Sequence, residues 1–94
     1  MVPANEFLEN ALNAMATRAQ ERDIEQERSM GKIVNVFNAL TGHTLTEAEG
    51  WEFMIILKLV RGRQGTFRED DYIDGAAYTA LLGEHKSNET TDIV

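Results

Sequence analysis

The stretch WEFMIILKLV, residues 51–60, constrains the fold of this chain more than any other segment. It follows Thr46 and Glu49, which stand in the T-x-x-E pattern of a capping box, and it is followed by the helix breaker Gly62. The segment therefore predicts a helix over about residues 47–61. Because this helix is apolar on nearly every side, we expect it at the centre of a bundle, or divided between the core and a subunit interface.

Two helices are predicted before this segment from the 3.6-residue spacing of their apolar side chains. One covers about residues 4–20, and the other covers about residues 29–40, with Ser29 as its N-cap and Gly42 as its C-terminal stop. Between them, residues 18–28 are nearly all charged or amide-bearing. Their sequence fits either a solvated continuation of the first helix or a connector.

A fourth helix is predicted over about residues 67–84, behind a second T-x-x-E pattern that starts at Thr66. Gly83 marks its expected end. Residues 87–94 would then form a polar tail, which has no apolar periodicity. The preceding residues 1–86 are predicted to form a single helical domain.

The short loop GRQGT joins the last two helices, so we expect them to form an antiparallel hairpin. The predicted fold class is all-α: a small bundle of about four helices, dominated by this hairpin, with the preceding helix packed across it. A chain of 94 residues buries only roughly 60–65% of its unfolded surface. Its small core and its strongly apolar helix together predict a homo-oligomer, most simply a dimer.

Composition excludes several classes of function. The chain has no cysteine and two histidines, which removes disulfides, thiolate zinc sites and cysteine nucleophiles, so that any metal would be bound by carboxylates. Its net charge of −7 disfavours direct binding to nucleic acid. No apolar run reaches the ~18–20 residues that span a bilayer. The N-terminal MVPANEFLEN carries acids and no basic flank, so we expect no signal peptide and a cytoplasmic protein.

Two acidic pairs extend the apolar stripes of the last two predicted helices. Glu49 and Glu52 form one pair, and Asp71 and Asp74 form the other, on a face that continues to Tyr78. Acids are common in first turns because they complement the helix dipole, so solvated helix caps are one interpretation and a carboxylate metal site is the other. Antiparallel packing would set the two pairs at opposite ends of the hairpin. A shared site would therefore require an early start of the last helix, a bend or a second subunit.

The pattern Glu49-x-x-Glu52, an apolar helix and then Asp71-x-x-Asp74 resembles MazG-like all-α nucleoside triphosphate pyrophosphatases. The runs MIILKLVRG and DDYIDGAAYTALLGE look like those of a family of small phage proteins, and this similarity covers about residues 28–85. The resemblance implies that the four carboxylates bind Mg²⁺, with Glu52 and Asp74 as catalytic residues. The products would be a nucleoside monophosphate and pyrophosphate. Asp71 stands where those pyrophosphatases carry glutamate.

Four further residues are candidates for substrate binding: Lys58, Arg61, Arg63 and Tyr78. Lys58 fits contact with a phosphate or a buried carboxylate, and it equally fits a lysine that extends to solvent. Arg61 and Arg63, together with Arg68, surround the glycine loop, where they can clamp phosphates by bidentate hydrogen bonds. The same arginines can instead cap the preceding helix and pair with nearby acids.

Two hypotheses about function follow. The first is a homo-oligomeric phage protein that binds nucleotides through Mg²⁺ and hydrolyses nucleoside triphosphates in the host cytoplasm. The second is a non-catalytic acidic accessory protein that sequesters a nucleotide signal or binds and inhibits a host defence protein. The net charge of −7 suits an accessory protein that binds a host protein, because an acidic surface can compete for a basic nucleic-acid site.

Overall fold

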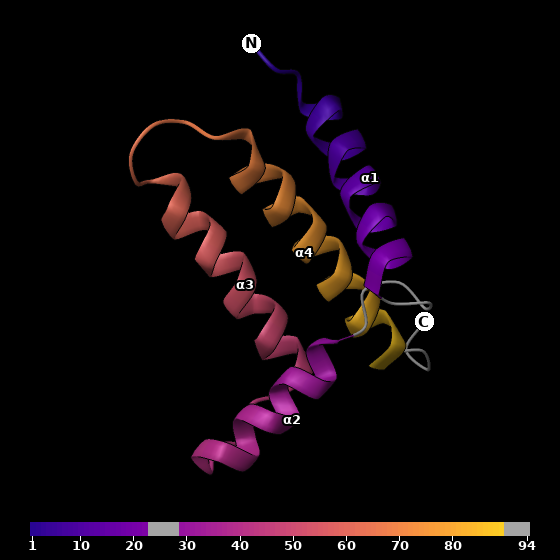
Figure 1. Cartoon of the computed structure of the whole chain (residues 1–94), viewed down its shortest axis with the longest axis vertical. Helices are drawn as coiled ribbons and strands as arrows, with labels where there is room; N and C mark the ends of the chain where they lie inside the picture. The colour runs from indigo at the N-terminus through magenta and orange to yellow at the C-terminus, as the bar shows by residue number, and fades with distance from the viewer. Residues whose placement is uncertain (23–28, 90–94) are drawn as a thin grey trace.

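The computed structural model describes residues 1–22 and 29–89, and for residues 18–22 it describes the backbone alone. Within this part of the chain the secondary structure is helical, and the helices are α1 (Ala4–Arg22), α2 (Met30–Thr41), α3 (Glu47–Gly62) and α4 (Glu69–Glu89) (Figure 1). The predicted all-α fold class is confirmed. None of these helices combines the length and apolar character needed to cross a membrane. The sequence did not decide whether residues 18–28 continue the first helix or form a connector. Residues 18–22 belong to α1, whereas residues 23–28 lie outside the described residues.

α4 is the central helix, with α3 on one side and α1 on the other (Figure 1). The antiparallel hairpin of α3 and α4 is confirmed. Ala77 is fully buried and, with Ile73, packs against Ala11 of α1. On the other side, Leu81 joins a cluster with Trp51 of α3. Small side chains on α4 allow α1 to approach closely, so α4 occupies the central place that the sequence suggested for α3.

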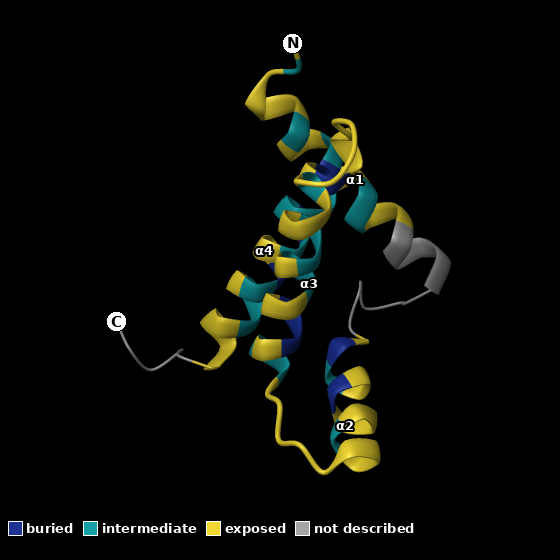
Figure 2. Cartoon of the chain, turned by 90° about the vertical axis from the view of Figure 1, so that its left-hand side faces the viewer, coloured by how far each residue is buried: buried dark blue, intermediate teal, exposed yellow. Residues whose placement is uncertain are grey.

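α2 does not lie across the hairpin as predicted. Among the described helices its backbone approaches that of α3 alone, and it points away from the hairpin beyond the start of α3 (Figures 1 and 2). The contact depends on Gly50, where an added Cβ would lie 2.5 Å from Met30 Sδ and 2.8 Å from Val34 Cγ2. The absence of a side chain at this position lets the start of α2 rest on α3.

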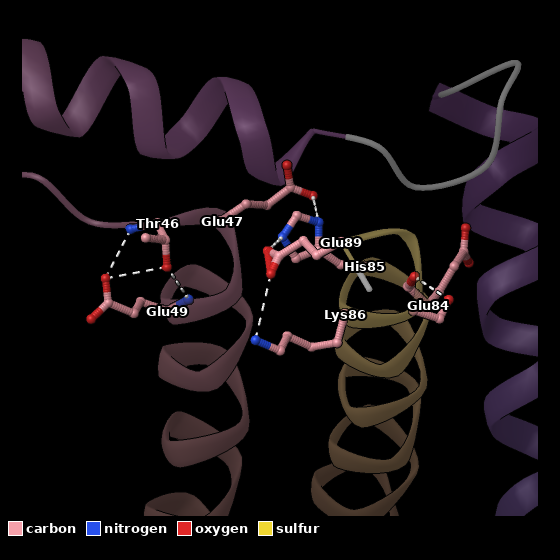
Figure 3. A network of polar contacts seen from close by, with 8 residues as sticks. Thr46, Glu47, Glu49, Glu84, His85, Lys86 and Glu89 are labelled. Carbon is pink, nitrogen blue, oxygen red and sulfur yellow. Dashed lines mark hydrogen bonds and ion pairs between the residues drawn. The ribbon is translucent and has the colours of Figure 1, made fainter. Parts of the chain in front are cut away.

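Local hydrogen bonds fix the turn between α2 and α3. Gly42 ends α2 with a left-handed φ of 78°, and its N–H donates to the Asn38 carbonyl at 2.9 Å, as the predicted stop requires. The side-chain amide of Asn38 donates to the Leu45 carbonyl (2.9 Å), and its oxygen accepts from the Leu45 N–H (3.0 Å). The predicted capping box of Thr46 and Glu49 is confirmed: each side chain accepts from the backbone N–H of the other, at 2.9 and 3.1 Å (Figure 3).

The second predicted capping box does not form. α4 begins at Glu69, so Thr66 lies outside the helix. At the start of α4 the rings of Phe67 and Tyr72 stack instead. Their centroids are 5.8 Å apart and their interplanar angle is 19°. This contact has the spacing of a hydrophobic staple, which joins the residue before the N-cap to the fourth helical residue.

The prediction that Gly83 ends the last helix is wrong. α4 continues to Glu89, so the first three residues of the predicted tail are helical; residues 90–94 lie outside the described residues. A glycine inside a helix costs about 1 kcal/mol relative to alanine. Contacts within the last turns offset this cost, since His85 Nε2 lies 2.7 Å from Glu89 Oε1 and Lys86 pairs with the same carboxylate.

Candidate functional site

A polar pocket of about 470 Å³ lies where the end of α3, the glycine loop and the start of α4 meet. We call it the loop-end pocket. Its volume falls in the range of roughly 300–1,000 Å³ that is typical of small-molecule sites. Its lining combines three basic, three acidic and one amide side chain: Lys58, Arg61, Gln64, Arg68, Asp70, Asp71 and Asp74.

An ion pair between α3 and α4 forms one wall of the pocket. Lys58 Nζ lies 2.9 Å from Asp74 Oδ2, and the two side chains are 12% and 19% exposed. Of the uses that the sequence left open for Lys58, contact with a partly buried carboxylate is therefore the one observed. Gly75 faces the lysine stem, and a Cβ there would lie in ordinary van der Waals contact with Lys58 Cβ, at 3.8 Å. The pair holds a positive and a negative group at fixed places beside the pocket.

Asp71 is the one charged residue that is buried within the described part of the chain, at 8% exposure. Its backbone N–H donates to the Arg68 carbonyl at 3.3 Å. In the described residues its carboxylate has no hydrogen bond or ion pair with another side chain. Among the described residues, no side-chain nitrogen or oxygen atom that is shut off from solvent lacks a hydrogen-bond partner, so the Asp71 carboxylate oxygens remain accessible from the pocket. Asp71 therefore offers an acceptor group to a ligand in the loop-end pocket.

The guanidinium groups of Arg61 and Arg68 are exposed on the same pocket. The alternative expectation was that these arginines pair with neighbouring acids, but neither forms an ion pair with any residue that the structure describes. Together with Lys58 they give the pocket three positive charges against three aspartates. The pocket is thus formally neutral in a chain whose net charge is −7, so it repels an anion less than the rest of the surface does.

The predicted convergence of four carboxylates does not occur within one chain. Asp71 and Asp74 line the pocket, whereas Glu49 and Glu52 lie near the opposite end of the antiparallel hairpin. Glu52 is exposed, roughly 9 Å along the α3 axis from Lys58 at 1.5 Å per residue. Across residues 1–22 and 29–89, no group of three or more acidic or histidine side chains is placed to hold a metal ion.

Two of the predicted substrate-binding residues, Lys58 and Arg61, line the pocket, and the other two do not. Arg63 is the C-cap of α3, and its backbone N–H donates to carbonyls in the last turn. The ring of Tyr78 packs near that of Trp51, with centroids 6.1 Å apart, beside the core. Tyr78 shares the face of Asp74, but that face continues from the pocket into the core.

Sequence reasoning missed two lining residues, Gln64 and Asp70. Their position in the sequence could have predicted this placement, because residues of a hairpin loop and of the following first turn lie at the same end of a helical bundle. The acidic pattern drew attention to Asp71 instead of Asp70. Gln64 carries no charge and belongs to no motif, so only the loop geometry identifies it.

A second polar cluster lies at the other end of the hairpin (Figure 3). His85 of α4 stands between two carboxylates, with Nδ1 3.4 Å from Glu47 Oε2 and Nε2 2.7 Å from Glu89 Oε1. Glu47 belongs to the first turn of α3, so the histidine joins the start of α3 to the end of α4. We assign this cluster a structural role.

Comparison with known protein families gives a match over most of the chain. The model of a family described as "Domain of unknown function (DUF6378)" matches residues 6–86, which include all of α2 and α3, most of α1 and α4, and the whole loop-end pocket. No curated protein and no solved structure matches the chain.

Proposed function

This chain belongs to the DUF6378 family, and we propose that it binds a nucleotide together with Mg²⁺ in the loop-end pocket. The observation that carries the proposal is the Asp71 carboxylate, which has no side-chain partner among the described residues and lines a pocket that also presents three basic side chains. A ligand that supplies both a cation and phosphate oxygens complements both kinds of group.

The basic side chains would bind the phosphates. Arg61 comes from the last turn of α3 and Arg68 from the end of the loop, so a phosphate between them would be held from two sides. Arginine suits this role because its planar group donates two parallel hydrogen bonds to one phosphate. Lys58 adds a point charge deeper in the wall, although it would share that charge with Asp74.

Asp71 and Asp74 would hold the magnesium ion. Mg²⁺ commonly keeps several waters and binds one or two carboxylates together with phosphate oxygens of the substrate. Two aspartates on the first two turns of α4 meet this requirement without the third and fourth carboxylates that the sequence had suggested. The ion would shield the aspartates from the phosphates, which they would otherwise repel.

The nucleotide is proposed on the resemblance to MazG-like pyrophosphatases, which also implies hydrolysis to a monophosphate and pyrophosphate. In such a reaction the metal would stabilise the developing charge and a carboxylate would orient the attacking water. Asp74 is the candidate for that role within the pocket. Glu52 does not reach the pocket of its own chain, so its predicted catalytic role would need a second subunit.

Titration calorimetry of the full chain with a panel of nucleoside triphosphates tests the proposal, with Mg²⁺ and with a chelator, and with product analysis by chromatography. We expect binding that requires Mg²⁺. Arg61→Gln and Asp71→Asn should each weaken it by roughly 10- to 100-fold, the worth of one charge-assisted contact. Turnover would establish hydrolysis, and binding without turnover would establish sequestration.

Glu69→Gln is the matched control, because it also removes one acid from the first turn of α4 but lies outside the pocket. It should bind as the parent does. Circular dichroism of each variant should show unchanged helix content. If no nucleotide binds, or if Arg61→Gln and Asp71→Asn bind as tightly as Glu69→Gln, the loop-end pocket is not the site.

A further inference from the structure

An exposed apolar face runs along α3, apart from the side that packs on α4. Its members recur at the three- and four-residue spacing that places side chains on one helix face. They are Phe53, Ile56, Leu59 and Val60, of which the first three are 66%, 56% and 61% exposed. None of these side chains belongs to the core clusters of the described residues. An exposed face of this kind marks an interaction surface.

The apolar face continues onto α2 across a groove of about 240 Å³. Apart from Gly50, the groove is lined by apolar side chains: Met30, Ile33, Val34, Phe37, Leu45, Phe53 and Met54. Beside it, α2 exposes a stripe made of Ile33, Val36, Phe37 and Leu40. Since Phe53 belongs to both the groove and the α3 face, the stripe, the groove and the face form one continuous surface, which we call the pairing surface.

The pairing surface is large enough for a stable interface. Nine large apolar side chains on it are exposed by more than a third: Ile33, Val36, Phe37, Leu40, Leu45, Phe53, Ile56, Leu59 and Val60. At roughly 100 Å² each, they present on the order of 900 Å², against about 800 Å² per partner in a standard protein–protein interface.

The apolar face of α3 has acidic residues at its start and a basic residue at its end. At about 100° per residue, Glu49 and Glu52 precede the apolar side chains on the same face, and Arg63 follows them. The capping box uses Glu49 Oε1, which holds this side chain at the start of α3. Glu52 and Arg63 are exposed and form no ion pair with the residues that the structure describes.

This pattern is complementary to itself when one copy of α3 is reversed. With a two-fold axis beside Ile56, Phe53 comes opposite Leu59 of a second copy, and Glu49 comes opposite its Arg63. A shift of the axis toward Leu59 places Glu52 opposite the same arginine. Parallel pairing would instead set glutamate against glutamate and arginine against arginine. Self-complementarity under a two-fold rotation is what the interface of a homodimer requires.

The geometry points to a homodimer in which the α3 helices pair in antiparallel orientation through the pairing surface. The second copy would place its Leu59 and Val60 beside Phe53, at the groove between α2 and α3. Its Arg63 would lie between Glu49 and Glu52. In this dimer the exposed stripe of α2 would pack on the second copy.

Light scattering coupled to gel filtration tests the dimer. The full chain should elute with twice its chain mass of 10.6 kDa, and Ile56→Glu should raise the dissociation constant by roughly 100-fold, because it buries an unpaired charge. Leu12→Glu is the matched control: Leu12 is 63% exposed on α1, outside the pairing surface. That variant should remain dimeric.

A charge exchange separates antiparallel from parallel pairing. Arg63→Glu should weaken the dimer, and the double variant Glu52→Arg/Arg63→Glu should restore it, whereas a parallel pair would gain nothing from the second change. Arg63 is exposed at the helix C-cap, so its substitution tests the interface even if Ile56→Glu fails to fold. A monomer at tens of micromolar, a dimer unaffected by both single changes, or no rescue overturns the inference. Nucleotide binding by a monomer would leave the proposed function intact.

Discussion

Replacement of Gly50 by alanine should push α2 away from α3. An alanine Cβ would lie 2.5 Å from Met30 Sδ and 2.8 Å from Val34 Cγ2, and both distances are shorter than a Cβ atom approaches non-bonded atoms in proteins. The methionine can turn about its side-chain bonds, but the Val34 methyl group is attached directly to its Cβ. Relief of that contact therefore requires either a rotamer of Val34 that is disfavoured in a helix or a movement of the α2 backbone.

The magnitude follows from two opposing effects. Alanine in a helix interior is favoured over glycine by about 1 kcal/mol, whereas one extra methyl group in a packed contact costs about 1–3 kcal/mol. Gly50→Ala should therefore range from neutral to about 2 kcal/mol less stable. Gly83→Ala is the matched control, because Gly83 also lies inside a helix and an added Cβ there meets nothing within 4 Å. The control should gain about 1 kcal/mol.

Thermal unfolding followed by circular dichroism compares the two variants. A difference of about 1–3 kcal/mol corresponds to several degrees in Tm, at about 4–8 °C per kcal/mol for a domain of this size. Both must be measured at one protein concentration, because dimer formation makes Tm concentration-dependent. If the two substitutions stabilise the chain equally, α2 does not rest on Gly50, and the reasoning about the α2–α3 contact is refuted.

Two further substitutions test local structure. Thr46→Ala should cost about 1 kcal/mol in chemical unfolding because it removes the capping box, whereas Thr44→Ala in the preceding loop should change stability by less than about 0.5 kcal/mol; equal effects would contradict the cap. Lys58→Met should lower the free energy of unfolding by about 1–3 kcal/mol, because it leaves the partly buried Asp74 without this cation. The double variant Lys58→Met/Asp74→Leu should recover part of that loss. No recovery in the double variant would show that the ion pair does not stabilise the hairpin.

The helices could be predicted from sequence because their signals are local. The capping box of Thr46 and Glu49 lies within one turn, and the Gly42 stop is a backbone conformation that glycine adopts without strain. The start of α4 was predicted wrongly because the T-x-x-E pattern at Thr66 matches a capping box, whereas the contact observed there joins two aromatic rings. The stack of Phe67 on Tyr72 gives no comparable motif in the sequence.

The arrangement of the helices could be predicted only in part, because it depends on contacts between distant residues. The start of α2 rests on α3 because Gly50 has no side chain, so that Met30 and Val34 pack directly against it. No residue near Gly50 in the sequence shows that these two side chains would pack there. Similarly, the acidic pairs could be placed on helix faces, but whether they meet depends on the sense of the hairpin. The short loop predicted antiparallel helices and therefore already opposed a single four-carboxylate site.

The two proposals concern separate faces of the same helix. Lys58 and Ile56 are two positions apart on α3, which places them about 200° apart around its axis. A second copy paired through Ile56 would therefore leave the loop-end pocket open to a nucleotide. The same geometry keeps Glu49 and Glu52 of the second copy on the far side of α3 from Asp71 and Asp74. A dimer would thus neutralise the glutamates with Arg63, while the aspartates would depend on Mg²⁺ to accept a phosphate. If the glutamates act in the dimer and the aspartates in Mg²⁺ binding, a chelator should abolish nucleotide binding and leave the dimer intact.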